Sequence, residues 1–200
     1  IGPVRKSTLF GGAMLGTALG AGLLVWGALV ESNRLTVRRV RLRVPGWPSD
    51  KTGYRIALMG DFHVRDVYSE NLARRACRAA LAEGPDLIVL AGDHIGRWKP
   101  GAADRLLAAL APLAEGDTPV VAVTGNHDWD SGDPESLRPV FDALGVRFLR
   151  NESVTIDGVT VVGIDSAREA AADPAKALAD LPDGPRLIVW HEPDAVDALR

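Results

Sequence analysis

Four short polar clusters contain all four histidines of this 200-residue chain. They read Gly-Asp-Phe-His at residues 60–63, Gly-Asp-His at 92–94, Gly-Asn-His-Asp at 125–128 and Trp-His-Glu-Pro-Asp at 190–194. Aspartate, asparagine and histidine offer oxygen and nitrogen ligands that suit manganese, iron, zinc or magnesium better than soft copper. Two such ions about 3.5–4 Å apart, bridged by one aspartate, can activate water for an in-line displacement at phosphorus. The clusters therefore predict a hydrolytic site with two divalent metal ions.

Each cluster follows an apolar run that predicts a buried strand, and these runs cover residues 55–59, 87–91, 120–124 and 186–189. Continuous apolar runs are typical of parallel strands, which are buried on both faces. Polar residues at the carboxyl ends of such strands line the crevice where open α/β sheets bind ligands. We therefore expect the four clusters to meet at one edge of the fold.

The remaining pattern indicates an α/β fold. Predicted strands at 54–60, 86–91 and 119–124 are each followed by a predicted helix, at 69–83, 102–114 and 134–144. A short strand at 146–149 and a hairpin at 153–156 and 159–164, turning at Asp157-Gly158, come next. A weak helix at 174–181, the strand at 186–190 and a helix from near residue 194 complete the order. Alternating strands and helices followed by a hairpin predict two packed sheets flanked by helices.

The order Asp-x-His, Gly-Asp, Gly-Asn-His-Asp and a later His, across residues 54–194, resembles the calcineurin-like metallophosphoesterases. The His-Glu-Pro-Asp form of the last cluster, together with an N-terminal apolar segment, is most similar to their membrane-anchored or exported bacterial branch. The resemblance implies a four-layer αββα sandwich of two mixed sheets between helices. It also implies a phosphodiesterase or pyrophosphatase that attacks phosphorus with a hydroxide held by two divalent ions.

The resemblance carries roles to seven residues of this chain. It implies that Asp61 and His63 bind the first metal, that Asp93 bridges both, and that Asn126 and His191 bind the second. It further implies that His127 is no ligand but protonates or stabilises the leaving oxygen, while Asp128 orients its ring. Histidine suits this task because its reference pKa near 6.5 allows both protonation states around neutrality.

Each of these residues also has a simpler interpretation when taken alone. Asp61 or Asp93 could cap a helix, Asn126 could belong to a turn, and His191 could be a hydrogen-bonded core histidine. Their order and their shared position at strand ends favour the metal site. His94 is the exception, because the family tolerates many residues there, and we predict a structural or rim role for it.

Further residues near the clusters have open interpretations. Trp98 and Trp129 either line a substrate cleft or cover the cores of loops. Glu192 and Asp194 either support the neighbouring ligand or cap a helix. The single cysteine, Cys77, has no partner for a disulfide, and we predict a buried or half-buried helix residue.

The closing motif of the family, Gly-His-x-His, does not follow His191 before the sequence stops at Arg200, and the first residue is Ile1 rather than methionine. We interpret the sequence as a fragment that lacks two metal ligands and the last strands of one sheet, and we expect the fragment alone to be inactive. The alternative is a non-catalytic membrane protein whose metallophosphoesterase-like domain binds metal without turnover.

Residues 9–30 form an uncharged, apolar stretch. A helix made of these residues would be about 33 Å long, enough to cross a hydrocarbon core of about 30 Å. We predict an uncleaved, single-pass anchor at 1–33, a basic strand and linker at 34–53, and the catalytic domain at 54–200. Within the linker, residues 34–44 partly alternate and predict a half-buried strand with a basic outer face.

Charge is divided unevenly along the chain. Residues 1–43 carry seven Lys/Arg and one Glu, whereas the remaining residues carry 16 Lys/Arg and 25 Asp/Glu. An acidic catalytic region argues against nucleic acid as a partner, since nucleic-acid binding needs a basic face. We expect the substrate to be a lipid-linked phosphate ester near the cell membrane.

The side of the membrane on which the domain lies has two opposing indications. The arginines after the apolar stretch favour a cytoplasmic domain, but the exported relatives favour the outside, and we expect an extracytoplasmic domain.

Overall fold

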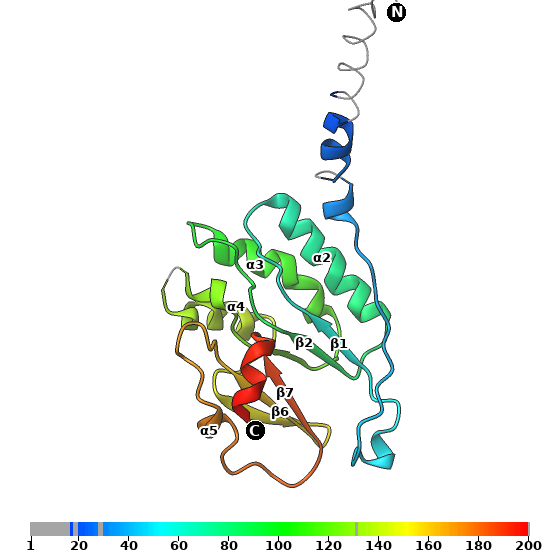
Figure 1. Ribbon diagram of the computed structural model, residues 1–200, viewed down its shortest axis with the longest axis vertical. Helices are drawn as coiled ribbons and strands as arrows, with labels where there is room; N and C mark the ends of the chain where they lie inside the picture. Colours follow the sequence, from blue (N-terminus) through cyan, green and yellow to red (C-terminus); the bar gives the residue numbers. More distant parts are fainter. Residues whose placement is uncertain (1–16, 18–19, 28–29, 131, 200) are drawn as a thin grey trace, which may run out of the picture. The chain divides into compact units, whose positions relative to one another are not determined.

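The computed structural model describes residue 17 and residues 20–27, 30–130 and 132–199. The chain divides into two compact units, Ile1–Thr36 and Val37–Arg200. The four polar clusters all belong to the second unit, which contains two β-sheets (Figure 1). The prediction of an α/β fold with two packed sheets is confirmed.

The first sheet has the strand order β1-β2-β3-β4, and all of its pairings are parallel. Its strands are β1 Ile56–Met59, β2 Leu87–Leu90, β3 Val120–Ala122 and β4 Arg147–Phe148. The connections contain helices α2 Val67–Ala82, α3 Ala102–Leu110 and α4 Arg138–Ala143. Parallel neighbours need such crossovers, which are almost always right-handed. We predicted mixed sheets, and for this sheet the prediction was wrong over the described strands.

The alternation of side chains along β2 explains how the sheet is covered on both faces. Ile88 and Leu90 belong to one core cluster together with residues of α2, α3 and α4, among them Phe141. Leu87 and Val89 point to the opposite face and belong to a second cluster, with residues of the other sheet. Successive side chains of a strand leave on opposite faces, so an entirely apolar strand is buried between helices and a second sheet.

The second sheet has the order β5-β6-β7, with β5 Glu152–Ile156, β6 Val159–Ile164 and β7 Arg186–Trp190. Strand β5 is antiparallel to β6, and β7 is parallel to β6, so this sheet is mixed. The predicted hairpin turn is confirmed: Asp157 and Gly158 have φ values of 48° and 76°, as a two-residue turn with positive φ at both positions requires. The outer face carries Val162 and Ile164, which pack against the short helix α5 Pro174–Ala177.

Short 3-10 helices replace or interrupt several predicted elements. These are η3 Ala111–Glu115, η5 Pro134–Leu137 and η6 Pro193–Leu199. Three more, η1 Glu31–Asn33, η2 Ser49–Lys51 and η4 Asn126–Trp129, lie between predicted elements. The helix predicted at 134–144 is η5 followed by α4, with Pro139 in the first turn of α4, where its missing N–H costs nothing. The helix predicted at 174–181 ends as α5 at Ala177, and Asp180 has a φ of 52° that no right-handed helix contains.

Helix α2 starts two residues before its predicted beginning because Asp66 caps it. The Asp66 carboxylate accepts hydrogen bonds from the backbone N–H groups of Tyr68 and Ser69, and these bonds satisfy donors that a helix start leaves free. Cys77 is fully buried in this helix, as predicted. Burial raises the pKa of its thiol to about 12, so it is an unreactive packing residue.

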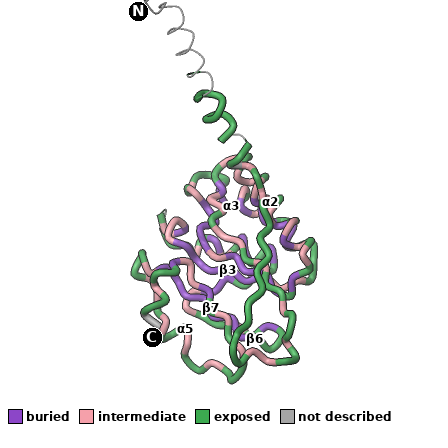
Figure 2. The backbone as a smooth tube through the Cα atoms, turned by 45° about the vertical axis from the view of Figure 1, so that its right-hand side comes forward, coloured by how far each residue is buried: buried purple, intermediate pink, exposed green. Residues whose placement is uncertain are grey.

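The segment before β1 differs from its prediction. We expected residues 34–44 to form a half-buried strand, but within the described part of the chain they pair with no strand, and Val40 and Leu42 are 62% and 79% exposed. Figure 2 shows this segment as an exposed trace, in contrast to the buried trace of β3. Its contact with the fold includes Arg39, whose guanidinium makes two hydrogen bonds of 2.6 Å to the Glu83 carboxylate.

The predicted membrane anchor at 9–30 lies mostly outside the described residues. Of this stretch, residue 17, residues 20–27 and residue 30 are described; residues 17 and 20–27 are helical, and residue 30 is in a turn. None of the helices that the structure describes combines the length and the apolar character that crossing a membrane requires.

Candidate metal centre

The ends of β1 and β2 stay side by side beyond the last paired residues of the strands. The backbone N–H of Asp61 donates to the carbonyl of Gly92 at 3.0 Å, and that of His63 donates to the carbonyl of Asp93 at 2.9 Å. A parallel bridge between Val64 and Ile95 continues the pairing. This extension of the sheet places the first two clusters next to each other.

Three residues in these two loops have left-handed backbone conformations that cost energy. The φ values are 53° at Asp61, 43° at His63 and 56° at Asp93. Such conformations are uncommon for residues other than glycine and cluster at functional sites. The positive φ values therefore mark these two loops as a candidate functional site.

Asp93 lies at the centre of the converging side chains and is only 2% exposed. Its Oδ2 atom is 3.4 Å from His63 Nε2 and 3.4 Å from His191 Nε2. His63 Nε2 is also 3.7 Å from Asp61 Oδ1. Ligands that share one ion through bonds of about 2.0–2.2 Å lie at comparable separations.

Two groups of three possible ligands form around this aspartate. One contains His63, Asp93 and His127, the other Asp61, Asp93 and His191, and the ligand atoms within each group lie within 4.8 Å of one another. Asp93 belongs to both groups, which is compatible with the predicted role of a bridging carboxylate. The donor set of carboxylate oxygens and imidazole nitrogens fits hard or borderline divalent ions.

The charges around Asp93 also fit a cation. Burial alone would raise the pKa of Asp93, but hydrogen bonds from His191 and from the backbone N–H of His127 outweigh it and lower that pKa. The hydrogen bond to Asp93 raises the pKa of His191 to about 9. The acidic groups thus favour a positive charge beside Asp93, and a metal ion can supply that charge in place of a proton.

Two glycines permit the close approach of the loops. A Cβ atom on Gly92 would lie 2.7 Å from both the backbone nitrogen of Gly125 and Nδ1 of His191, and one on Gly125 would collide with the Asp93 carboxylate. With glycine at 92, His191 Nδ1 lies 2.7 Å from the carbonyl oxygen of Ala91. The glycines in the second and third clusters therefore make room for the ligand side chains.

Asp128 has a different task from the one predicted. Its carboxylate is fully buried and accepts four backbone hydrogen bonds, of 2.8–3.2 Å, from Asp93, His94, Ile95 and Gly125. We predicted that Asp128 would orient the ring of His127, but Nδ1 of that ring lies 2.6 Å from Oδ2 of Asp130. The Asp128 carboxylate uses its lone pairs to accept four hydrogen bonds from backbone N–H groups. The carboxylate of Asp130, two residues further on, holds the His127 ring instead.

His127 lies at the open side of the cluster. Its side chain is 44% exposed, and its ring meets the ring of His63 edge-on, with 4.8 Å between the centroids. Asn126 is half-buried and is the first residue of η4, directly before His127. Both residues thus follow β3 at the same edge as Asp93.

The remaining polar residues of the clusters support the fold. His94 is fully buried, and its Nε2 lies 2.9 Å from the carbonyl oxygen of Val123, so it is structural and does not lie on a rim. Trp129 donates from Nε1 to Asp165 at 3.1 Å, and Trp98 packs against the core under the helices. Glu192 is 8% exposed and accepts from Ser166.

Asp130 and Asp165 were not predicted as site residues. Asp165 directly follows the fully buried strand β6, so the rule that drew attention to the four clusters also applies to it. Asp130 gave no comparable signal, because the direction of its side chain depends on the single turn of η4.

Comparison with known proteins agrees with this geometry. The family model for calcineurin-like phosphoesterases matches residues 54–195, and the chain belongs to this family of metal-dependent phosphoester hydrolases, which use a dinuclear divalent metal centre. The chain is 24% identical to UDP-2,3-diacylglucosamine pyrophosphatase LpxG of Chlamydia trachomatis, over 94% of this chain and 72% of that protein. It is 26% identical to phosphodiesterase YaeI of Escherichia coli, over 80% and 61%.

A third relative is the transmembrane protein with metallophosphoesterase domain of Danio rerio, 25% identical over 97% of this chain and 46% of that protein. The chain therefore spans less than half of this relative and about three fifths of YaeI. The names of these relatives support the predicted membrane-associated branch of the family.

Proposed function

We propose that the protein hydrolyses a phosphodiester or pyrophosphate bond at the site centred on Asp93. The observation that carries the proposal is the position of this buried carboxylate in both groups of possible ligands. When bound, two divalent ions supply an activated water and stabilise negative charge on the phosphate oxygens. Manganese, iron, zinc and magnesium all suit these donors.

The residues divide into two ligand sets that share one member. By the roles that the family resemblance implies, Asp61, His63 and Asp93 would hold the first ion, and Asp93, Asn126 and His191 would hold the second. The two geometric groups share Asp93 with these sets but place Asp61 beside His191 and His127 beside His63. The short separations between His63, Asp61 and Asp93 support the first set, and the 3.4 Å approach of His191 to Asp93 supports the second.

His127 acts on the leaving group in this proposal. Asp130 accepts a hydrogen bond from Nδ1 and fixes the ring, so the protonated ring donates from Nε2, its other nitrogen. The His127 side chain is 44% exposed beside His63, so we place its ring within reach of the substrate. General acids placed in this way typically contribute about 10²–10⁴-fold to the rate.

We place the enzyme at the cell membrane, with an anchor at 1–33, a linker at 34–53, and a catalytic domain at 54–200 with the four-layer αββα fold of its family. The catalytic domain faces outward and acts on a lipid-linked substrate. The name of the UDP-2,3-diacylglucosamine pyrophosphatase LpxG supports a lipid-linked substrate, and that of the transmembrane relative supports the membrane. The outward orientation rests on the resemblance to exported members of the family. Protease digestion of intact spheroplasts should degrade the domain; full protection would place it in the cytoplasm.

The central test is hydrolysis of bis-p-nitrophenyl phosphate by the full-length protein after chelation and return of Mn²⁺. We expect chelation to abolish hydrolysis and Mn²⁺ to restore it in the wild type but not in Asp93→Asn, because an amide is a poor bridge between two cations. Asp104→Asn is the matched control, since Asp104 is exposed in the first turn of α3. A wild-type rate for Asp93→Asn would refute the proposed site.

A further inference from the structure

The proposed second metal position depends on both sheets. Asn126 follows β3 of the first sheet, whereas His191 follows β7 of the second. The ligands of the first position, in contrast, all follow β1 and β2, whose ends are hydrogen-bonded to each other. The geometry of the second position therefore changes whenever one sheet shifts against the other.

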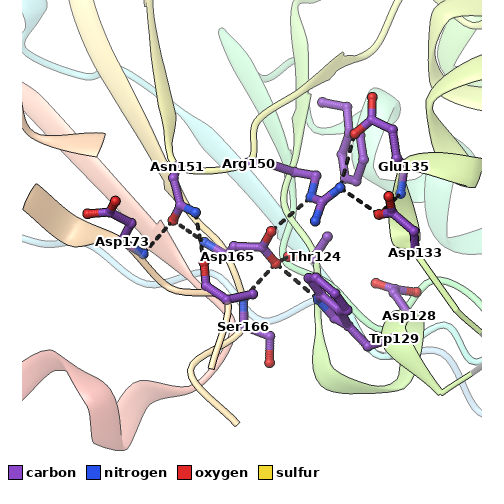
Figure 3. A network of polar contacts seen from close by, with 12 residues as sticks. Thr124, Asp128, Trp129, Asp133, Glu135, Arg150, Asn151, Asp165, Ser166 and Asp173 are labelled. Atoms are coloured by element: carbon purple, nitrogen blue, oxygen red, sulfur yellow. Dashed lines mark hydrogen bonds and ion pairs between the residues drawn. The ribbon is translucent and has the colours of Figure 1, made fainter. Parts of the chain in front are cut away.

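A chain of buried polar side chains connects the two sheets at this point (Figure 3). Asp165, directly after β6, is 1% exposed. Its carboxylate accepts from the hydroxyl of Thr124 and from Nε1 of Trp129 at 3.1 Å. These donors lie two residues before and three residues after Asn126. Asp165 therefore holds the loop that carries Asn126 from both sides.

The connection continues towards His191 through the next residue. Ser166 is fully buried, and its hydroxyl donates to Glu192 Oε1 at 2.5 Å. The other oxygen of Glu192 accepts from the backbone N–H of Ala167 at 3.3 Å. Because Glu192 directly follows His191, the Ser166 hydroxyl and the Ala167 N–H tie the end of β7 to the end of β6.

Arg150 completes the environment of the Asp165 carboxylate. Its Nε donates to Oδ2 at 2.8 Å, and its guanidinium carbon lies 5.0 Å from the centre of the Trp129 ring. Buried ion pairs often contribute little to stability relative to apolar residues of the same size. Arg150 is half-buried and also pairs with Asp133 and Glu135, so its bond to the buried Asp165 contributes to defined positions more than to stability.

We propose that Asp165 and Ser166 are positioning residues that fix the distance between Asn126 and His191, and so complete the second metal position without touching the metal. This inference rests on the proposed function, since it assumes two metal positions. It assigns a role to residues outside the four clusters.

The test is Mn²⁺ binding to the full-length protein after removal of metal, followed by electron paramagnetic resonance, which distinguishes a coupled pair of ions from a single ion. In the wild type we expect two ions and a coupled signal. Asp165→Asn and Ser166→Ala should keep the first ion at wild-type affinity and bind the second about 10–100-fold more weakly, the usual effect of losing a residue that supports a ligand. The signal of a single ion should then replace the coupled one.

Two control variants separate positioning from packing. Ile164→Val changes only the buried apolar residue before Asp165, and Ser153→Ala removes an exposed hydroxyl from β5 of the same sheet. Both should keep two tightly bound ions. If Asp165→Asn does not fold, Ser166→Ala alone decides, because it removes a single hydroxyl.

Equal affinities of wild type and Ser166→Ala for both ions would overturn the inference, and so would equal weakening of both. A wild-type protein that binds no metal would instead refute the proposed function itself.

Discussion

Asp128 and Asp130 stand two residues apart yet act on different partners. Asp128 is buried and accepts four backbone hydrogen bonds, whereas Asp130 is 54% exposed at its side chain and holds Nδ1 of His127. The first carboxylate fixes loops, and the second fixes a ring. At the scale of single residues, Asp128 therefore positions the backbone of the loops, and Asp130 positions the side chain of His127.

Replacing His127 by Asn should leave the metal content intact and lower kcat by about 10²–10⁴-fold, the typical contribution of a general acid. Asp130→Asn should give a smaller loss in the same direction, because the ring remains but is no longer held. Both losses should be larger for alkyl phosphodiesters than for nitrophenyl esters, whose leaving groups need little protonation. Equal losses for the two classes of substrate would argue against the proposed role of His127.

At the scale of elements, the Asp128 carboxylate joins the loops after β2 and β3. One oxygen accepts from His94 and Ile95, and the other accepts from Asp93 and Gly125. An asparagine offers only one oxygen, and its NH₂ group would face two N–H donors. The loops that carry the ligands depend on this single buried side chain.

Asp128→Asn should therefore lower the free energy of unfolding of the metal-free protein by about 3 kcal/mol, since buried donors left unpaired cost about 1–3 kcal/mol each. Thermal or urea unfolding in the presence of chelator measures this change, with exposed Asp104→Asn as the control. An unchanged unfolding midpoint for Asp128→Asn would show that the four hydrogen bonds do not support the loops.

The sequence predicted those parts of the fold and site that follow from strand-end chemistry. Apolar runs revealed the strands, and the polar residues after them include Asp61, Asp93 and His191, which the structure brings together. The partner of His127 was not predictable, because it depends on side-chain directions within one turn. Residues 34–44 were mispredicted because alternation alone does not supply a neighbouring strand.

At the scale of the whole molecule, the two sheets meet through a shared apolar core of Val89, Val121, Val161 and their neighbours. The proposed first metal position belongs to one sheet, and the second includes His191 from the other. Asp93 is a member of both proposed positions and of both groups of possible ligands. The whole proposed centre therefore depends on this one residue.

Metal analysis of the full-length Asp93→Ala variant tests this central claim most directly. The protein should be stripped with chelator, equilibrated with Mn²⁺, separated from free metal and analysed for manganese per chain. We predict two ions in the wild type and the loss of both in Asp93→Ala, because the shared ligand is gone, with Asp104→Ala retaining wild-type content. Wild-type occupancy in Asp93→Ala would contradict the account.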